Sequence, residues 1–117
     1  CELQKHDGTN WRFVINTGSA EEVLWTDTQS PANTWTHVLA TYDGANIKIY
    51  INGSQHGSDV AKTGNINTTT ADTVIGLRTT SSDRGFEGQI DEVRIYNRAL
   101  TTAEITKNYK HGKSKHS

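Results

Sequence analysis

The dipeptide Asn52-Gly53 is the sequence feature that most constrains what this chain can fold into. It follows residues 46–51 (NIKIYI), where isoleucine stands at every second position. Such alternation is typical of a strand with one buried face. Asn-Gly readily supplies a positive φ at two successive positions, which a two-residue type I′ turn requires. The sequence therefore predicts an antiparallel hairpin that turns at these two residues.

Further strand patterns recur at short, regular spacing, in residues 11–16, 22–27, 35–43 and 73–78. The stretch 35–43 (WTHVLATYD) is apolar on both faces, which predicts a strand covered from two sides. Only 32% of the residues are hydrophobic, and Thr, Asn, Gly and Ser are abundant. This composition favours many short strands joined by polar turns over a helical bundle. We therefore expect an all-β fold, an antiparallel β-sandwich.

Residues 86–105 (FEGQIDEVRIYNRALTTAEI) predict a long strand over 86–97 followed by one short helix. The apolar alternation shifts by one residue at Asp91-Glu92, which indicates a bulge or bend there. Thr101 and Glu104 have the spacing of a capping box, and the flanking apolar residues have that of a hydrophobic staple. We expect the helix to run from about 102 to 110 and to end at Gly112. Residues 79–85 are expected to form a loop.

Four segments together resemble a laminin-G-like domain of the concanavalin A-like lectin/glucanase superfamily, of the type found in bacteria and archaea as modules of large secreted proteins. They are WTHVLATYDG (35–44), IKIYING (47–53), VIGL (74–77) and residues 86–105. The resemblance implies a jelly-roll sandwich over residues 1–111, followed by a polar tail at 112–117. Members usually have further strands before the position of Cys1, so the resemblance implies either a fragment or a naturally shortened sandwich.

Charge and composition exclude several classes of function. The formal net charge is −1 with acids and bases interspersed, which predicts no nucleic-acid partner. No apolar run approaches the ~20 residues that span a bilayer, so no membrane insertion is expected. A single cysteine excludes an internal disulfide and a cysteine-based zinc site. Because the chain starts at Cys1 and not at Met, we expect a mature or excised piece of a longer protein.

Catalysis is not expected. Glycoside hydrolysis needs two carboxylates on either side of the scissile bond. Asp91 and Glu92 are adjacent, so on a regular strand they would point to opposite faces. His37 lies in a core-like strand, and we interpret it as a packed structural residue rather than a base.

Asp91 is the candidate metal ligand. The resemblance implies that this position in the G-x-I-D element can belong to a calcium site, so calcium is the one cofactor to consider. The usual partner ligands, however, lie in the N-terminal strands that are absent here. The alternative is that Asp91 accepts hydrogen bonds from backbone N–H groups at the bend.

Carbohydrate binding requires an aromatic face and polar groups that contact the hydroxyls. Trp25 lies in a less apolar segment than the other tryptophans and is the candidate stacking platform. Arg12, Arg78 and Arg84 are the candidate polar contacts. Trp11 and Trp35 are expected in the core.

The resemblance implies a non-catalytic carbohydrate-binding or adhesion module of a larger secreted or cell-surface protein, with a glycan or a protein surface as partner. The alternative is a structural or assembly module that binds no sugar. Because a shortened sandwich exposes edges, we also expect a homodimer formed through residues 86–97 and 11–16. The opposing possibility is a monomer whose edge is protected by charges such as Glu87, Glu92 and Arg94.

Overall fold

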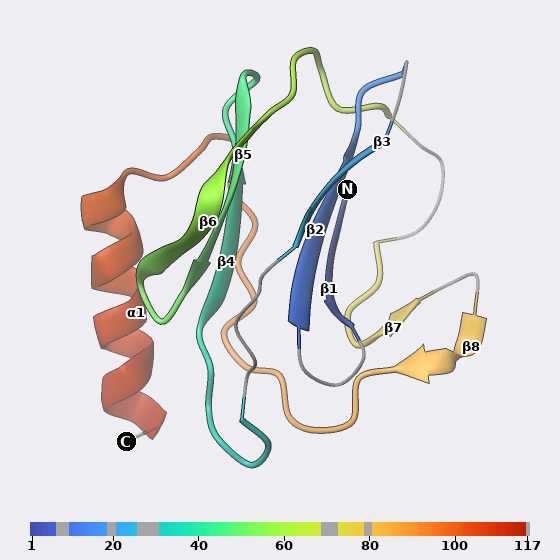
Figure 1. Cartoon of the computed structure of the whole chain (residues 1–117). Helices are drawn as coiled ribbons and strands as arrows, with labels where there is room; N and C mark the ends of the chain where they lie inside the picture. Colours follow the sequence, from blue (N-terminus) through green and yellow to red (C-terminus); the bar gives the residue numbers. More distant parts are fainter. Residues whose placement is uncertain (7–9, 19–20, 26–30, 69–72, 79–80, 117) are drawn as a thin grey trace.

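The computed structural model of the protein describes residues 1–6, 10–18, 21–25, 31–68, 73–78 and 81–116. Within these ranges, the structure describes only the backbone of His6, Trp25, residues 77–78 and residues 81–84. Figure 1 shows two facing β-sheets with a helix packed on the outer side of one of them.

Both large sheets are antiparallel and three-stranded. The first has the order β1-β2-β3, with β1 at Glu2–His6, β2 at Asn10–Asn16 and β3 at Glu21–Trp25. The second has the order β4-β5-β6, with β4 at Val38–Tyr42, β5 at Asn46–Ile51 and β6 at Ser54–Ala61. A separate hairpin joins β7 (Leu77–Arg78) to β8 (Ser81–Gly85), and helix α1 spans Thr102–His116. The predicted β-sandwich with one C-terminal helix is confirmed.

The main core lies between the two large sheets. Its buried members come in equal parts from the two sheets: Phe13, Ile15 and Leu24 from one, and Ile47, Ile49 and Ile51 from the other. All six are at most 8% exposed. The isoleucines are the alternating set of the predicted hairpin strand, so the period-two pattern correctly identified the inner face of β5.

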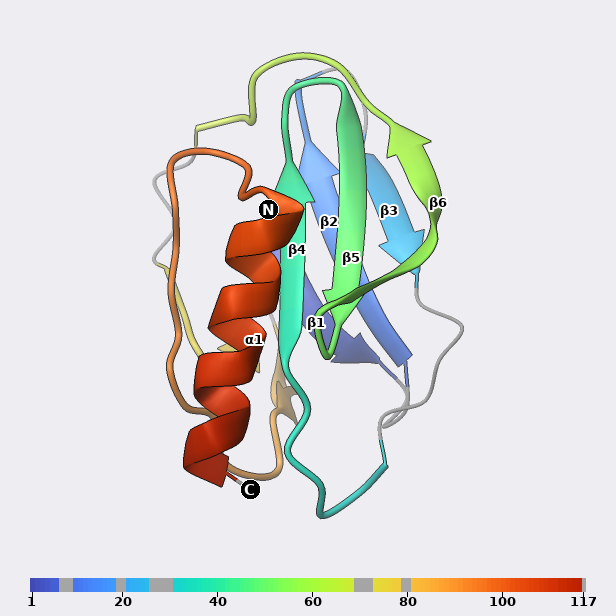
Figure 2. The same ribbon diagram turned by 90° about the vertical axis from the view of Figure 1, so that its left-hand side faces the viewer.

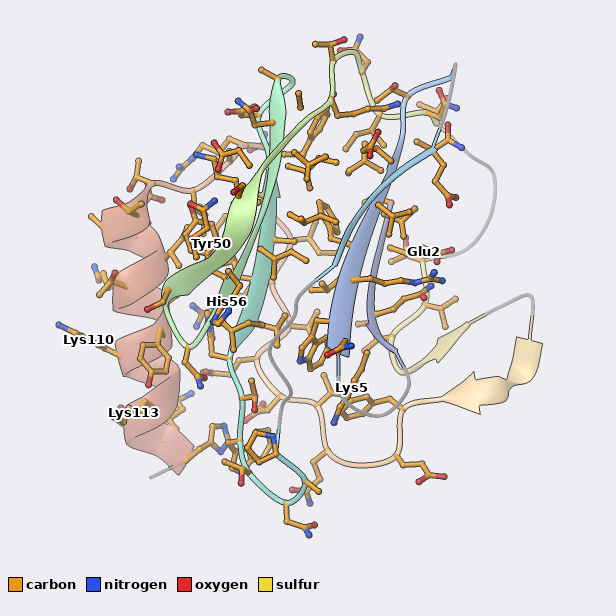
Figure 3. The ribbon with its side chains drawn as sticks, in the orientation of Figure 1. Glu2, Lys5, Tyr50, His56, Lys110 and Lys113 are labelled. Atoms are coloured by element: carbon orange, nitrogen blue, oxygen red, sulfur yellow. The ribbon has the colours of Figure 1, made fainter. Side chains whose placement is uncertain are left out.

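A second, smaller core lies between the β4–β5–β6 sheet and α1. Tyr50 points from β5 toward the helix (Figure 3) and packs with Leu100 and Ile105, which is fully buried. Leu39 joins this cluster, whereas Val38 packs against the main core. The β4 strand is therefore covered from both sides, as its pattern predicts. No helix among the described residues has the length and apolarity to cross a membrane.

The hairpin turn and the helix start follow the local sequence signals. Asn52 and Gly53 have φ values of 51° and 83°, as a type I′ turn requires. The Thr101 hydroxyl accepts a hydrogen bond from the Glu104 backbone N–H at 3.3 Å and donates one to the Glu104 carboxylate at 3.1 Å. Arg98 holds the same carboxylate through two further hydrogen bonds. The hairpin and the capping box are both confirmed.

The predicted strand over 86–97 is wrong, because this fully described stretch belongs to no strand. It runs extended beside α1, on the β4 side of the sheet (Figure 2), but it does not pair with β4. A strand requires a hydrogen-bonded neighbour, and an alternating sequence alone cannot supply one. The bend is in its predicted place, since Glu92 has a φ of 53°. Two adjacent expectations are also wrong: 73–78 forms only the two-residue strand β7, and the expected loop at 79–85 contains β8.

Gly112 does not end the helix, and residues 112–116 are its last turns rather than a tail. Lys113, Lys115 and His116 lie in the final turn, where positive charge favours the negative end of the helix dipole. A Cβ at Gly112 would lie 3.3 Å from the Glu92 carboxylate, so glycine allows the 86–97 segment to approach the helix closely. Packing and charge together outweigh the roughly 1 kcal/mol cost of a helical glycine.

One further residue and one strand differ from expectation. Trp35 is not a core residue: it is 44% exposed and stacks on His116 of α1, with ring centroids 3.9 Å apart. Trp11 is partly buried against the main core, in agreement with its predicted place. The strand β1 was not predicted, because its sequence, ELQKH, contains only one apolar residue and so shows no apolar alternation.

Candidate functional site on the outer face of the β1–β2–β3 sheet

The outer face of the β1–β2–β3 sheet carries a polar hollow of about 180 Å³. Its lining residues come from β2 and from both neighbouring segments: Cys1, Glu2, Arg12, Val14, Asn16 and Glu21. The strand register explains this grouping, because Glu2 pairs with Val14 and Asn16 pairs with Glu21. Directly paired residues project from the same side of a sheet. These side chains therefore lie opposite the core-facing Phe13 and Ile15.

Arg12 is positioned by its neighbour on β1. Its Nε donates a hydrogen bond to the Gln4 side-chain oxygen at 2.7 Å, and Gln4 pairs with Arg12 in the register. The Gln4 amide in turn donates to the Glu2 carboxylate. Val14 is 6% exposed and forms an apolar floor beside these polar groups. The face thus offers a guanidinium, two carboxylates and two amides over a short apolar base.

The structure brings two of the four predicted ligand-binding residues together. Trp25 of β3 is the register partner of Arg12 on β2, so the two backbones are directly adjacent. The side chain of Trp25 lies outside the described residues. Arg78 and Arg84 belong to β7 and β8, which form a different sheet, and their side chains also lie outside the description.

Asp91 is held by the helix and by the bend. One carboxylate oxygen accepts the Glu92 backbone N–H at 2.8 Å, and the other lies 3.1 Å from His116 Nε2. The neighbouring Glu92 carboxylate bonds Lys115 at 2.7 Å, and this bond lowers the pKa of Glu92. Among the described residues, no group of three or more His, Cys, Asp or Glu side chains could hold a metal ion. As arranged, these residues do not fit a calcium site, since an ion would have to displace His116 and Lys115.

His37 has the environment of a packed residue rather than of a base. Its ring lies 5.9 Å from the Tyr109 ring, and its buried Nδ1 has no hydrogen-bond partner among the described residues. Burial lowers the pKa of His37, and the nearby positive charge of Arg94 lowers it further. The negative charge of Glu92 acts in the opposite direction and raises the pKa of His37, but by less than burial and Arg94 lower it.

Sequence reasoning missed most of the polar residues on the outer face. Glu2, Gln4, Asn16 and Glu21 become neighbours only because β1 and β3 flank β2 in this register. Nothing in the sequence marks β1 as a strand, so no local signal could have found this group. A second hollow, of about 430 Å³, lies at the helix C-terminus and is lined by Trp35, Gln89, Ile90, Asp91 and His116.

Comparisons with known proteins agree with the fold. Residues 2–106 match the model of a laminin-G-like family described as the Concanavalin A-like lectin/glucanases superfamily. A mouse protein, Pappalysin-1, is 30% identical over 97 residues, which are 80% of this chain but 6% of the mouse protein.

A solved structure is also similar. It is the crystal structure of residues 221–444 of an S-layer domain-containing protein from Clostridium thermocellum, with a TM-score of 0.58 and 26% identity. The match covers 86% of this chain and 51% of that one, so the chain spans about half the length of this relative. The chain is a member of the laminin-G-like family of the concanavalin A-like lectin/glucanase superfamily.

Proposed function

We propose that this domain is a non-catalytic module that binds carbohydrate through the outer face of the β1–β2–β3 sheet. The observation that carries the proposal is the cross-strand array around Arg12, which Gln4 holds in place. Sugar hydroxyls both donate and accept hydrogen bonds, so they suit a surface that mixes a guanidinium with carboxylates and amides. The nearly buried Val14 forms the floor of the hollow, toward which the C–H groups of a sugar ring would face.

The size of the hollow favours contact with one sugar unit of a longer glycan. Its volume of about 180 Å³ is below the ~300 Å³ at which pockets begin to enclose a small molecule. The backbone of Trp25 pairs with that of Arg12 on the next strand, so we include Trp25 in the proposed surface beyond the hollow. A shallow, polar, extended surface is suited to the end or side of a polysaccharide.

The absence of a catalytic role is part of the proposal. Asp91 and Glu92 are engaged by His116 and Lys115 respectively. Neither carboxylate is placed to oppose the other across a bound sugar, as hydrolysis requires.

The setting we propose is a larger secreted or cell-surface protein. The supporting observation is that the matched region is only part of each relative, 6% of the mouse protein and 51% of the S-layer domain structure. A domain that recurs inside longer chains of different kinds is typical of a binding or adhesion module.

A glycan array tests the binding proposal. We expect the folded domain to bind a restricted set of glycans, and Arg12→Gln and Trp25→Ala to weaken that binding. Arg98→Gln is the matched control, because Arg98 contacts Glu104 at the start of α1, away from this face. No glycan binding by a cooperatively folded domain, or equal loss in the Arg98 control, would refute the proposal. A clean negative would favour the assembly module instead.

A further inference from the structure

Asn16, at the end of β2, has its side-chain amide fixed by two hydrogen bonds. Its Oδ1 accepts one from the Gly18 backbone N–H at 3.1 Å and one from Nδ2 of Asn67 at 2.9 Å. An amide oxygen has two lone pairs, so these two bonds use its whole accepting capacity. Asn16 also lines the polar hollow on the outer face. The group that it can present to the hollow is therefore the other end of the amide, the Nδ2 donor.

Asn67 reaches Asn16 because the loop after β6 crosses from the β4–β5–β6 sheet to the β1–β2–β3 sheet (Figure 1). The loop is held to the sheet it leaves by a hydrogen bond that the Tyr42 hydroxyl donates to the Gly64 carbonyl. It is held to the sheet it joins by the Asn67 backbone N–H, which donates to the Asn16 carbonyl at 2.9 Å. The backbone therefore brings the Asn67 side chain to the same place whether or not its amide bonds Asn16.

The bend after β2 leaves little space around the Asn67 side chain. A Cβ at Gly18 would lie 3.1 Å from Oδ1 of Asn67, and Gly18 has a φ of 94°, which side chains disfavour. The nitrogen of the Asn67 amide is thus held by Asn16, and the oxygen lies against the bend. This fit fixes which end of the Asn67 amide faces Asn16, and so keeps a donor opposite the Asn16 oxygen.

Glu21 lies directly opposite Asn16 in the sheet. The two residues are register partners on β3 and β2, and both line the hollow. Directly opposed residues have Cβ atoms about 4.5–5.5 Å apart. An ionised carboxylate only accepts hydrogen bonds, whereas the Nδ2 of Asn16 only donates them. The pair therefore offers a donor and an acceptor to a single hydroxyl group, which can accept from Asn16 and donate to Glu21.

The charges of the hollow disfavour an acidic ligand. Among the lining side chains, Glu2 and Glu21 are acidic and Arg12 alone is basic. A carboxylate or sulfate group on a sugar could accept a hydrogen bond from Asn16, but it has no proton to give to Glu21. It would also place a like charge beside that carboxylate, which is destabilising. A neutral hydroxyl satisfies both members of the pair.

Given the proposed carbohydrate-binding function, on which this inference rests, we propose that Asn67 is a positioning residue that fixes Asn16 as a hydrogen-bond donor. Asn16 and Glu21 together then select neutral, hydroxyl-bearing sugars over acidic ones. Asn67 acts through Asn16 and not through a contact of its own with the sugar. The ligand class of the outer face thus depends on a loop that comes from the opposite sheet.

NMR of the unliganded domain tests the hold on Asn16. Asn67→Ala removes the side-chain donor but keeps the backbone N–H, so it should shift the side-chain NH2 signals of Asn16 and the backbone amide signal of Gly18. Asn65→Ala is the matched control, because Asn65 is an exposed asparagine of the same loop, and it should leave these signals in place. Asn67 is also exposed, so neither change should unfold the domain. Unshifted Asn16 signals in Asn67→Ala would overturn the proposal.

Oligosaccharide binding tests the ligand class. The probes are gluco-, manno- and galacto-oligosaccharides and their uronic-acid counterparts, in which the primary hydroxyl is oxidised to a carboxylate. We expect the parent domain to bind at least one neutral series about tenfold or more tightly than its oxidised counterpart, and Glu21→Gln to reduce that ratio. Asn67→Ala should weaken binding of the neutral series by about threefold to tenfold, the contribution of one hydrogen bond, whereas Asn65→Ala should bind as the parent does.

The outcomes distinguish this proposal from the proposed function. If the parent domain binds no oligosaccharide, the proposed function and the ligand class are refuted together. If neutral oligosaccharides bind and Asn67→Ala leaves their affinity unchanged, carbohydrate binding stands but the role of Asn67 is overturned. Equal binding of a neutral series and its oxidised counterpart would likewise overturn the selection by Asn16 and Glu21.

Discussion

Gly53 lies in the hairpin turn and packs against Tyr109 of helix α1. Its replacement should therefore affect both the turn and the contact with the helix. A Cβ at this position would lie 2.9 Å from Cδ1 of Tyr109 on α1, closer than normal packing allows. The residue also has a φ of 83°, a conformation that side chains disfavour. Gly53→Ala therefore adds backbone strain in the turn and a steric contact with the helix.

Substitution of Gly44 is a control that contains the backbone strain but not the steric contact. It has a φ of 89°, but a Cβ there would have no heavy atom within 4 Å. Gly44→Ala should therefore cost only the left-handed backbone term, about 1–2 kcal/mol. Gly53→Ala should cost a further ~1–3 kcal/mol for overpacking against Tyr109. The difference between the two variants measures the contact between the hairpin and the helix.

Chemical denaturation followed by tryptophan fluorescence would give the free energies of unfolding. A double-mutant cycle with Tyr109→Ala then isolates the contact. We expect the Gly53→Ala/Tyr109→Ala variant to be about 1–3 kcal/mol less destabilised than the sum of its two single changes, because the clash has been removed. Equal effects of the two glycine substitutions, together with a strictly additive cycle, would refute the docking of α1 against this turn.

Three other perturbations test separate parts of the structure. Thr101→Ala should lower the free energy of unfolding by about 0.5–2 kcal/mol through loss of the helix cap, and an unchanged denaturation midpoint would contradict the assigned helix start. Calcium should leave the melting temperature unchanged, because Asp91 is engaged by His116; a rise that Asp91→Asn abolishes would instead assign a calcium site. The lowered pKa of His37 means that, below about pH 6.5, the unfolded state binds more protons than the folded state, so stability should fall as the pH is lowered below that value. His37→Gln should flatten that fall, and an unaltered pH profile would count against a buried neutral imidazole.

Local signals predicted the parts of this fold that depend on local interactions. The turn at Asn52-Gly53, the buried alternation of β5 and the cap at Thr101 each follow from residues within a few positions of one another. Such features are encoded by backbone preferences and nearby hydrogen bonds, so they can be derived without knowledge of the tertiary structure.

Features that depend on distant partners were not predictable in the same way. The 86–97 segment has the alternation of a strand, but no described neighbour pairs with it. Helix α1 continues past Gly112. Glu92, from the distant 86–97 segment, contacts Lys115 in the last turn of the helix. Trp35 was expected in the core, yet it is covered only in part, by His116. In each case a contact between remote segments, or the lack of one, decided the result.

The candidate site shows the same division. Trp25 was chosen for its less apolar segment and Arg12 for its residue type, and the register of β2 and β3 makes their backbones direct partners. Glu2 and Gln4 were missed because β1 has too little apolar alternation to be recognised as a strand. Arg78 and Arg84 belong to a different sheet, which residue type could not reveal.

The proposal that the outer face of the β1–β2–β3 sheet binds carbohydrate is tested most directly by NMR. Backbone amide shifts would be recorded while a glycan selected on the array is added to the domain. We predict that the perturbed amides cluster on this face, around Glu2, Arg12, Asn16 and Glu21, and that the 89–97 segment is unaffected by the glycan itself. Perturbations confined to 89–97 or to the hollow beside Trp35, with none on the outer face, would contradict the proposed site.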